Sequence, residues 1–184
     1  KAIGGMIRLS NGNTIRQGRI VGKAQLPKTA LACFQIVEYF RSFLVGRMFW
    51  SKINALMIIS GAFGAFEKDV VIAVGGYTLK TAGEDMDLVV KIHRYKSKNK
   101  KKYKIIFSPQ AVCWTQAPET LRDFNRQRRR WGVGNMQVIN RYKDMLWNPK
   151  YGTVGLIAMP YYLMYEYLGP AIVLLGILIT PLNI

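Results

Sequence analysis

Apolar residues recur at helical spacing in three stretches of the chain, and these stretches predict its longest helices. The first covers residues 29–50, where polar residues interrupt a repeating apolar series, as in an amphipathic helix. The second begins at the acidic residues 84–87, which apolar residues follow at helical spacing. The third runs from Pro118 to about Met145, and the glycines within residues 132–134 mark a point where it could break.

Short apolar runs between these helices predict β-strands. Residues 1–8 and 15–21 give two short strands, and residues 55–59 give one that is apolar throughout and hence buried. Residues 103–107 form a further strand. Pro109 is expected to end it, because proline cannot donate to a strand ladder, and residues 111–114 are expected to extend the sheet edge.

Charge divides the chain into a basic body and an apolar end. The sequence holds 27 Lys and Arg against 10 Asp and Glu, a net charge of +17, which favours nucleic acid or an anionic membrane face as a partner. From residue 154 to residue 184 the only charged residue is Glu166, and about 20 apolar residues can span a bilayer. A basic domain joined to an apolar segment indicates a membrane protein with a cytoplasmic basic part, and it argues against nucleic acid.

Three regions follow from these patterns. Residues 1–117 form the body, residues 118–150 an amphipathic helical region, and residues 151–184 a segment that lies at the membrane interface and then crosses the bilayer. Cys33 and Cys113 are far apart in the sequence and do not have the spacing of zinc ligands.

An acidic cluster stands out in this basic chain, in the stretch Gly83-Glu84-Asp85-Met86-Asp87-Leu88. The helix macrodipole favours acids in a first turn, which is one explanation of the cluster. A helix would also place Asp85 on the apolar face, whereas Glu84 and Asp87 would lie on the more polar side. Asp85 is therefore the acid predicted to point inward, where a carboxylate can take a proton from a hydroxyl group.

Small residues and glycines follow the predicted strand at residues 55–59. In residues 60–66 they would let a ligand approach the backbone closely. A tight turn without a ligand is an equal alternative.

The third predicted helix carries a polar and aromatic patch. Gln127, Arg130 and Trp131 stand at i, i+3 and i+4 and so share one face. Arginine binds phosphate bidentately and tryptophan can stack on a sugar ring, so the patch suits a phosphorylated sugar. A separate cationic stripe, expected to meet lipid phosphate, is formed by Arg122, Arg126 and Arg129.

The order of these motifs resembles the C-terminal half of the catalytic domain of processive family 2 glycosyltransferases. Cellulose, chitin, hyaluronan and poly-N-acetylglucosamine synthases belong to that group. The resemblance rests on the small-residue loop, Val-Gly-Gly-Tyr at 74–77, Glu84-Asp85, Cys-Trp at 113–114, Pro-Glu-Thr-Leu at 118–121 and Gln-x-x-Arg-Trp at 127–131. It implies an α/β fold, the C-terminal part of a GT-A nucleotide-diphospho-sugar transferase, followed by interfacial and transmembrane helices.

The resemblance also implies roles for individual residues. Asp85 matches the general base, Glu84 matches a supporting acid, and Gly83 stands where the family often has threonine. Arg130 matches the residue that contacts the donor diphosphate, with Gln127 as its polar partner. The residues that match the acceptor site are Trp131, Ser60, Gly61, Ala62 and Phe63.

The family holds its nucleotide and divalent metal with an Asp-x-Asp motif N-terminal to this region. The only Asp-x-Asp here is Asp85-Met86-Asp87, which stands at the position of the base. The resemblance therefore implies that Mg²⁺ or Mn²⁺ binds in a more complete enzyme. This chain alone is expected to bind no metal, to bind a UDP-sugar weakly and not to turn over.

These observations predict part of a membrane-bound inverting β-glycosyltransferase at the cytoplasmic face of the cell membrane. Its donor would be a UDP-sugar and its acceptor a growing glycan. Two alternatives stay open, a single-transfer glycosyltransferase with a lipid acceptor and a non-enzymatic basic module that binds membranes or nucleic acid. Product length would separate the first alternative, and binding to UDP-agarose compared with DNA-cellulose would separate the second.

Overall fold

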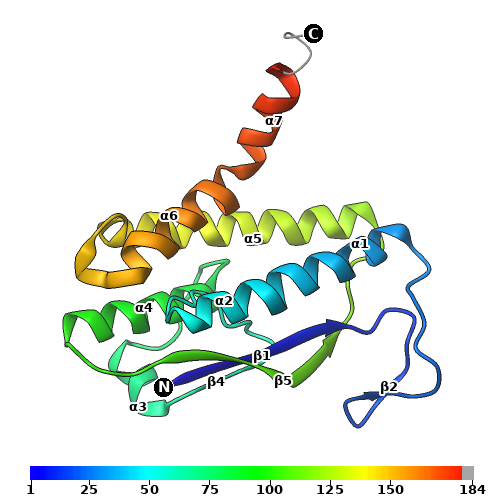
Figure 1. The fold of residues 1–184 in the computed structure, drawn as a ribbon, viewed down its shortest axis with the longest axis horizontal. Helices are drawn as coiled ribbons and strands as arrows, with labels where there is room; N and C mark the ends of the chain where they lie inside the picture. The colour runs from blue at the N-terminus through cyan, green and yellow to red at the C-terminus, as the bar shows by residue number, and fades with distance from the viewer. Residues whose placement is uncertain (180–184) are drawn as a thin grey trace.

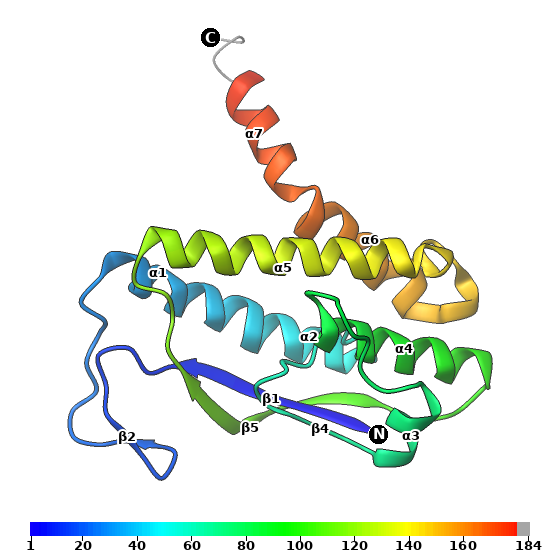
Figure 2. The ribbon, with the colours of Figure 1, turned by 180° about the vertical axis from the view of Figure 1, so that it is seen from behind.

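The structure is a computed structural model that describes residues 1–179. A three-stranded sheet lies beneath two levels of helices (Figures 1 and 2). Its central strand is β1 (Ala2–Leu9), with β4 (Gly64–Phe66) antiparallel on one side and β5 (Ile105–Thr115) parallel on the other. A separate hairpin is formed by β2 (Ile15–Arg16) and β3 (Arg19–Ile20).

The helices above the sheet form two levels in Figures 1 and 2. The lower level contains α1 (Ala30–Tyr39), a π-helical segment (Phe40–Gly46), α2 (Arg47–Lys52) and α4 (Glu84–Lys98), and the short α3 (Lys68–Ala73) lies near the sheet. Above them runs α5 (Leu121–Arg141). The chain then continues through 3₁₀ turns (Lys143–Met145 and Pro149–Tyr151), a π-helical segment (Val154–Ala158), α6 (Met159–Tyr161), a further π-helical segment (Tyr162–Tyr167) and α7 (Gly169–Ile179), which projects from the body.

The three helices predicted from the hydrophobic pattern are confirmed. Threonine caps begin two of them: Thr29 Oγ1 accepts a hydrogen bond from Ala32 N (3.3 Å), and Thr120 Oγ1 accepts one from Asp123 N (3.2 Å). The first predicted helix contains a π-helical segment in its middle. The third does not break at its glycines, because α5 is continuous through residues 132–134.

Two strand predictions are wrong, one for residues 55–59 and one for the end of the strand at Pro109. Residues 55–59 are buried as expected, with Leu56 and Met57 fully shielded, but they form no strand. A fully apolar run indicates burial without specifying a hydrogen-bond ladder. Pro109 does not end its strand, since β5 continues across it: Gly5 pairs with residue 108 and the next residue of β1 pairs with Val112. The proline lies in the resulting bulge, where no ladder donor is needed.

The core lies between the sheet and α4, and it extends to the underside of α5. Leu88, Val89 and Ile92 of α4 are fully buried, as are Ile105 of β5 and Val138 of α5. At about 25 cal/mol per Å² of apolar surface, shielding side chains of this size is the main stabilising contribution. This packing fixes the first turn of α4 against α5.

Within residues 1–179, no helix has both the length and the apolar character needed to cross a bilayer. The transmembrane part of the prediction for residues 151–184 is therefore not confirmed. Residues 180–184 of that segment lie outside the described residues.

Candidate active site

The small-residue loop, residues 60–63, is fixed to the sheet by a glycine of β1. Gly5 N donates a hydrogen bond to Phe63 O (3.2 Å), and a Cβ at Gly5 would lie 2.3 Å from the Phe63 ring and 2.8 Å from Ala111 O. Only glycine therefore allows the loop to cross the strand at this point. The loop also closes on itself, because Phe63 N donates to Ser60 O (3.0 Å).

Asp85, in the first turn of α4, lies against this loop. Its Oδ2 accepts a hydrogen bond from Gly61 N (3.3 Å), and its Oδ1 accepts one from Met86 N (2.8 Å). A Cβ at Gly61 would stand 3.8 Å from Asp85 Cβ and 3.9 Å from Glu84 Oε1. The structure thus brings both acids to the backbone of the loop. The Asp85 side chain is partly exposed there, so its carboxylate can receive a proton from a bound hydroxyl group.

Asp87, and not Asp85, is the acid that points into the core, which corrects the prediction. Asp87 has no exposed side-chain surface, and its carboxylate accepts hydrogen bonds from Thr78 Oγ1 (2.5 Å), Arg141 Nη1 (2.6 Å) and Tyr142 Oη (3.1 Å). Lys91 Nζ lies 3.4 Å away. Burial alone would raise the pKa of Asp87, but these hydrogen bonds outweigh it and lower the pKa.

The loop before α4 is joined to the middle of α5. Gln137 Oε1 accepts hydrogen bonds from Thr81 Oγ1 (3.0 Å) and Ala82 N (2.9 Å). Gly83 and Gly134 meet through their backbones, so closely that a Cβ on either would lie 2.8 Å from an atom of the other. The acidic start of α4 and the Gln-x-x-Arg-Trp helix, which are far apart in the sequence, are therefore packed together.

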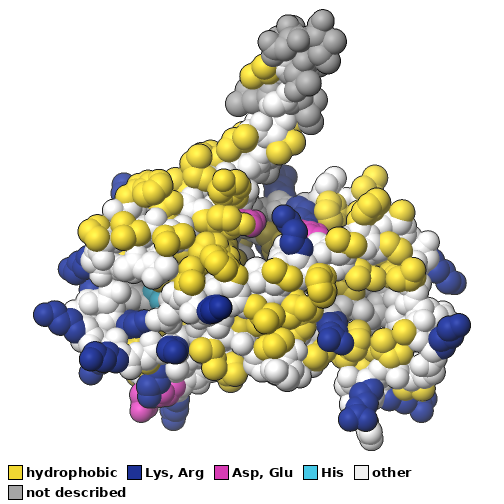
Figure 3. All heavy atoms as spheres, viewed as in Figure 1, with side chains coloured by type: hydrophobic (Ala, Val, Ile, Leu, Met, Phe, Trp, Pro, Cys, Tyr) yellow, Lys and Arg dark blue, Asp and Glu magenta, His cyan; other side chains and the backbone are white. Residues whose placement is uncertain are grey.

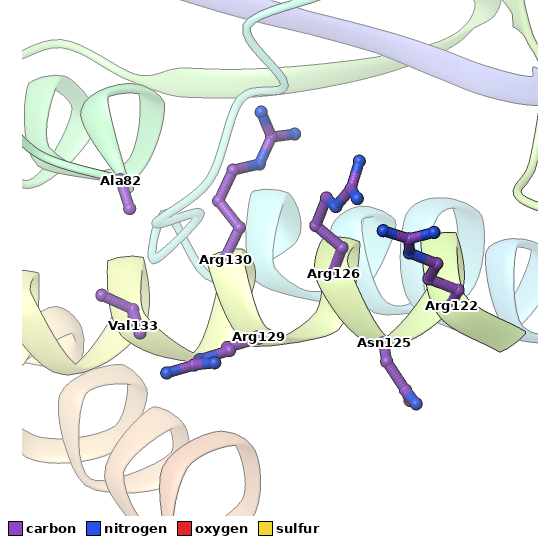
Figure 4. A pocket seen from close by; sticks show the side chains of 7 residues that line it. All are labelled: Ala82, Arg122, Asn125, Arg126, Arg129, Arg130 and Val133. Atoms are coloured by element: carbon purple, nitrogen blue, oxygen red, sulfur yellow. The ribbon is translucent and has the colours of Figure 1, made fainter.

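Arg130 lies among the other arginines of α5, and this also corrects the prediction. An open pocket of about 490 Å³ is lined by Ala82, Arg122, Asn125, Arg126, Arg129, Arg130 and Val133. In Figure 4 the side chains of Arg122, Arg126 and Arg130 point to one side of the helix, and those of Arg129 and Asn125 point to the other. Arg130 therefore shares a face with Arg122 and Arg126, at i, i+4 and i+8. Asp85 is not among the residues that line this pocket.

Gln127 and Trp131 lie on a different, partly buried face of α5. Gln127 Oε1 is buried and has no hydrogen-bond partner among residues 1–179. The Trp131 ring lies 6.1 Å from the Phe43 ring, with an angle of 48° between the planes, and the Arg128 guanidinium covers it at 4.5 Å. The predicted patch is thus divided, with Arg130 in the pocket and Trp131 against the helices below.

Arg47 of α2 is a charged residue that the sequence reading missed. Its side chain is buried, its guanidinium lies 4.1 Å from the centre of the Phe43 ring, and its Nη1 has no hydrogen-bond partner among the described residues. Burial lowers the pKa of Arg47 to about 10, so the group stays charged at neutral pH. Asp85 is one of the groups whose negative charge favours this cation. In the sequence, Arg47 shares a helical face with Phe43 and Trp50, but an arginine in a helix is usually exposed and no motif indicates that this one is buried.

The described residues do not fit a divalent metal. Within residues 1–179 no group of three or more His, Cys, Asp and Glu side chains is close enough to hold one. Asp87 cannot serve with Asp85 as a ligand pair, because its oxygens are already occupied by four donors. The Asp-x-Asp of this chain therefore pairs a partly exposed carboxylate, Asp85, with a buried one, Asp87, whose oxygens are already bound.

The fold and the candidate site together indicate a class of enzyme. A mixed α/β domain with a carboxylate at a backbone loop and an arginine pocket beside it is suited to transfer of a group from a phosphorylated donor. The chain belongs to glycosyl transferase family group 2, whose family model matches residues 20–183. The family is one of glycosyltransferases, and the predicted resemblance is confirmed.

Individual relatives agree with the family. The probable glycosyltransferase YdaM of Bacillus subtilis (strain 168) is 31% identical over 136 residues, which cover 71% of this chain and 30% of the relative. Poly-beta-1,6-N-acetyl-D-glucosamine synthases of Staphylococcus aureus (strains COL and MSSA476) are 31% identical over 128 residues, which cover 67% of this chain and 29% of each relative. The chain thus spans about 30% of the length of these relatives.

Proposed function

We propose that this chain forms the acceptor side of an inverting glycosyltransferase site that transfers a sugar from a UDP-sugar to the end of a glycan. The observation that carries the proposal is the position of Asp85. Its carboxylate stands at the Gly61 backbone, and the helix that bears it packs on α5 next to the arginine pocket. The poly-N-acetylglucosamine synthase relatives favour a polysaccharide acceptor.

In the proposed reaction, Asp85 acts on the acceptor and the arginine pocket acts on the diphosphate of the donor. Asp85 accepts the proton of the acceptor hydroxyl group. At the same time the hydroxyl oxygen forms a bond to the anomeric carbon of the donor sugar. The bond from that carbon to the diphosphate breaks, and UDP leaves with the electron pair. Arg130, with Arg126 beside it, stabilises the negative charge of the leaving diphosphate. Attack from the side opposite the leaving group inverts the anomeric configuration.

The acceptor end is held by backbone and by an aromatic ring. In the turn formed by Ser60, Gly61, Ala62 and Phe63, the Gly61 N–H contacts the Asp85 carboxylate. Trp131 is proposed to contact the acceptor sugar with the part of its ring that Arg128 and Phe43 leave free. Glu84 lies beside the same loop as a second, supporting acid. Mg²⁺ or Mn²⁺ and the nucleotide would be held in a complete enzyme by an Asp-x-Asp motif N-terminal to this region.

We further propose that the site works at the cytoplasmic face of the cell membrane. Aromatic and aliphatic side chains gather on the face seen in Figure 3, over α1, α2 and the C-terminal helices. Exposed large apolar residues of the helical segments include Phe34, Phe40, Phe49, Ile157 and Tyr165. An apolar surface of this kind, on a protein of net charge +17, suits an anionic bilayer.

Substitution of Asp85 tests the function. In the full-length protein that carries this chain, Asp85→Asn should abolish sugar transfer and leave UDP-sugar binding nearly unchanged, as measured by product formation and by titration calorimetry. Asp69→Asn is the matched control, because Asp69 is an exposed acid in the first turn of α3. Normal turnover in Asp85→Asn would refute the assignment. The length of the product separates a polymerising enzyme from one that makes a single transfer to a lipid.

A further inference from the structure

Arg128 is held between two aromatic rings on α5. Its guanidinium carbon lies 4.6 Å from the centre of the Phe124 ring and 4.5 Å from that of Trp131. The three residues stand at i, i+4 and i+7 and so share one face of the helix. A guanidinium at this distance is attracted to the face of an indole, and the attraction grows as water is excluded.

Glu38 of α1 fixes the orientation of that guanidinium. Arg128 Nη2 donates to Glu38 Oε2 (2.6 Å), and Arg128 Nη1 donates to the second carboxylate oxygen, Glu38 Oε1. The two side chains are only 24% and 33% exposed, so solvent screens the pair weakly. A two-point contact sets the plane of the guanidinium as well as its position, which a single hydrogen bond cannot do.

The indole is also contacted by the segment that follows α1. The Trp131 ring lies against the Phe43 ring, and Phe43 stacks on Tyr39 with ring centres 4.4 Å apart and an angle of 7° between the planes. Glu38 and Tyr39 are neighbours in the chain. One short stretch of α1 therefore acts on Trp131 along two routes, one ionic and one aromatic.

We propose that Glu38 and Arg128 are positioning residues, which fix the Trp131 indole in the orientation that receives the acceptor sugar. The inference rests on the proposed function, in which Trp131 contacts the acceptor. The ion pair orients the guanidinium, the guanidinium orients the indole, and the acceptor meets a ring that needs no further ordering. Preorganisation of this kind strengthens acceptor binding because less conformational freedom is lost when the sugar binds.

Three variants in the full-length protein test the proposal. Glu38→Gln should raise the KM for a glycan acceptor about tenfold while the KM for the UDP-sugar stays unchanged, since Arg130 is not touched. Arg128→Met should do the same. The exchange Glu38→Arg with Arg128→Glu restores an ion pair between α1 and α5 but leaves a carboxylate facing the indole. It should recover thermal stability without recovering the acceptor KM.

A control and an optical measurement complete the test. Asp144→Asn breaks a different ion pair between elements, that with Arg94 (2.8 Å), and should leave the acceptor KM unchanged. The near-ultraviolet circular dichroism of Glu38→Gln should differ from that of the unmodified protein, and the difference should vanish when both carry Trp131→Phe. This signal reports the orientation of the indole without requiring activity.

The outcomes separate the two proposals. If the charge exchange restores the acceptor KM together with stability, the pair is a structural ion pair only and the positioning role is overturned. An unchanged dichroism spectrum in Glu38→Gln overturns it as well. If the spectrum changes and Trp131→Ala itself leaves the acceptor KM unaltered, the positioning of the indole holds and the acceptor role of Trp131 fails.

Discussion

Gly83 and Gly134 are in backbone contact, and this contact sets the spacing between the acidic start of α4 and the arginine-bearing helix α5. A Cβ at Gly83 would lie 2.8 Å from Gly134 O, and a Cβ at Gly134 would lie 2.8 Å from Gly83 N. Real Cβ atoms do not approach backbone atoms so closely. The contact therefore leaves no room for a Cβ at position 83 or at position 134 in this chain.

Alanine at either position should force the two helices apart. We expect Gly83→Ala and Gly134→Ala each to lower the free energy of unfolding by about 1–3 kcal/mol, the usual cost of overpacking. Transfer activity should fall with it, because Asp85 moves away from the arginine pocket. Urea unfolding and initial rates measure the two effects.

Gly132→Ala is the matched control for that pair. Gly132 is exposed in the middle of α5 and a Cβ there would meet nothing within 4 Å. Alanine should stabilise the helix by about 0.5–1 kcal/mol, since it loses less conformational freedom than glycine on folding. Equal stability of the Gly83→Ala and Gly132→Ala variants would show that the backbone contact does not constrain the helices.

Asp87 should matter for stability where Asp85 matters for chemistry. Asp87→Asn removes the charge that Arg141, Tyr142 and Lys91 surround, and breaking a buried ion pair in this way costs about 3 kcal/mol or more. Asp85→Asn, at the partly exposed loop, should change the free energy of unfolding by less than about 1 kcal/mol. Denaturant titrations of the two variants side by side test the contrast, and similar losses would contradict it.

The Asp87 carboxylate should also contribute to the loss of stability at acidic pH. The pKa of Asp87 is lower in the folded chain than its ordinary value of 3.8, so its stabilising contribution is complete above that value. As the pH falls below 3.8 the unfolded chain binds the proton first, and the contribution is lost. Unfolding midpoints measured from pH 5 to pH 2 should therefore fall less steeply in Asp87→Asn than in the unmodified chain. Parallel curves would contradict the assignment.

His93 should govern stability at a higher pH. Its ring is buried in α4, Nε2–H donates to Leu56 O (2.8 Å), and burial lowers the pKa of His93 from 6.5 to about 4. The unfolded chain therefore takes up the proton first as the pH falls below 6.5. Stability should be constant above that pH and decline by about 3 kcal/mol between pH 6.5 and pH 4.

A variant isolates this effect, because His93 is the only histidine of the sequence. In His93→Gln an amide can still donate to Leu56 O, but no group titrates near pH 6. The free energy of unfolding should then stay flat from pH 7 down to about pH 5. A slope as steep as that of the unmodified chain would assign the titration to another group.

The sequence predicted which segments build the site, because periodicity reports which face of a helix is apolar. It located the start of α4, the loop at residues 60–63 and the helix with Gln127, Arg130 and Trp131, and the structure brings these segments together. It predicted the wrong inward acid for a physical reason. The donors that allow Asp87 to be buried, Thr78 Oγ1 and Arg141 Nη1, lie outside α4, and a single helical pattern cannot reveal them.

Other features depended on partners that only the fold supplies. Nothing in the spacing of Glu38 indicates Arg128, which lies 90 residues further along the chain. Arg130 shares a face with Arg122 and Arg126, because positions four and eight residues apart on one helix align, and this relation is visible in the sequence. For residues 55–59 the apolar pattern correctly predicts burial, but it does not predict that these residues form no strand.

Arg47 offers a prediction in which loss of a charge increases stability. Its buried guanidinium has no hydrogen-bond partner for Nη1 within residues 1–179, and it lies over the face of Phe43 at 4.1 Å. Burying an unpaired polar group costs about 1–3 kcal/mol and more when it is charged, whereas a cation over an aromatic ring returns about 0.5–2 kcal/mol. The cost exceeds the gain, so Arg47→Met, which keeps a long unbranched side chain, should raise the free energy of unfolding by about 1 kcal/mol. Arg41→Met, at an exposed position of the π-helical segment that precedes α2, should leave it unchanged. A lower stability of Arg47→Met than of Arg41→Met, in urea titrations at neutral pH, would mean that the guanidinium contributes more to the fold than its contacts account for.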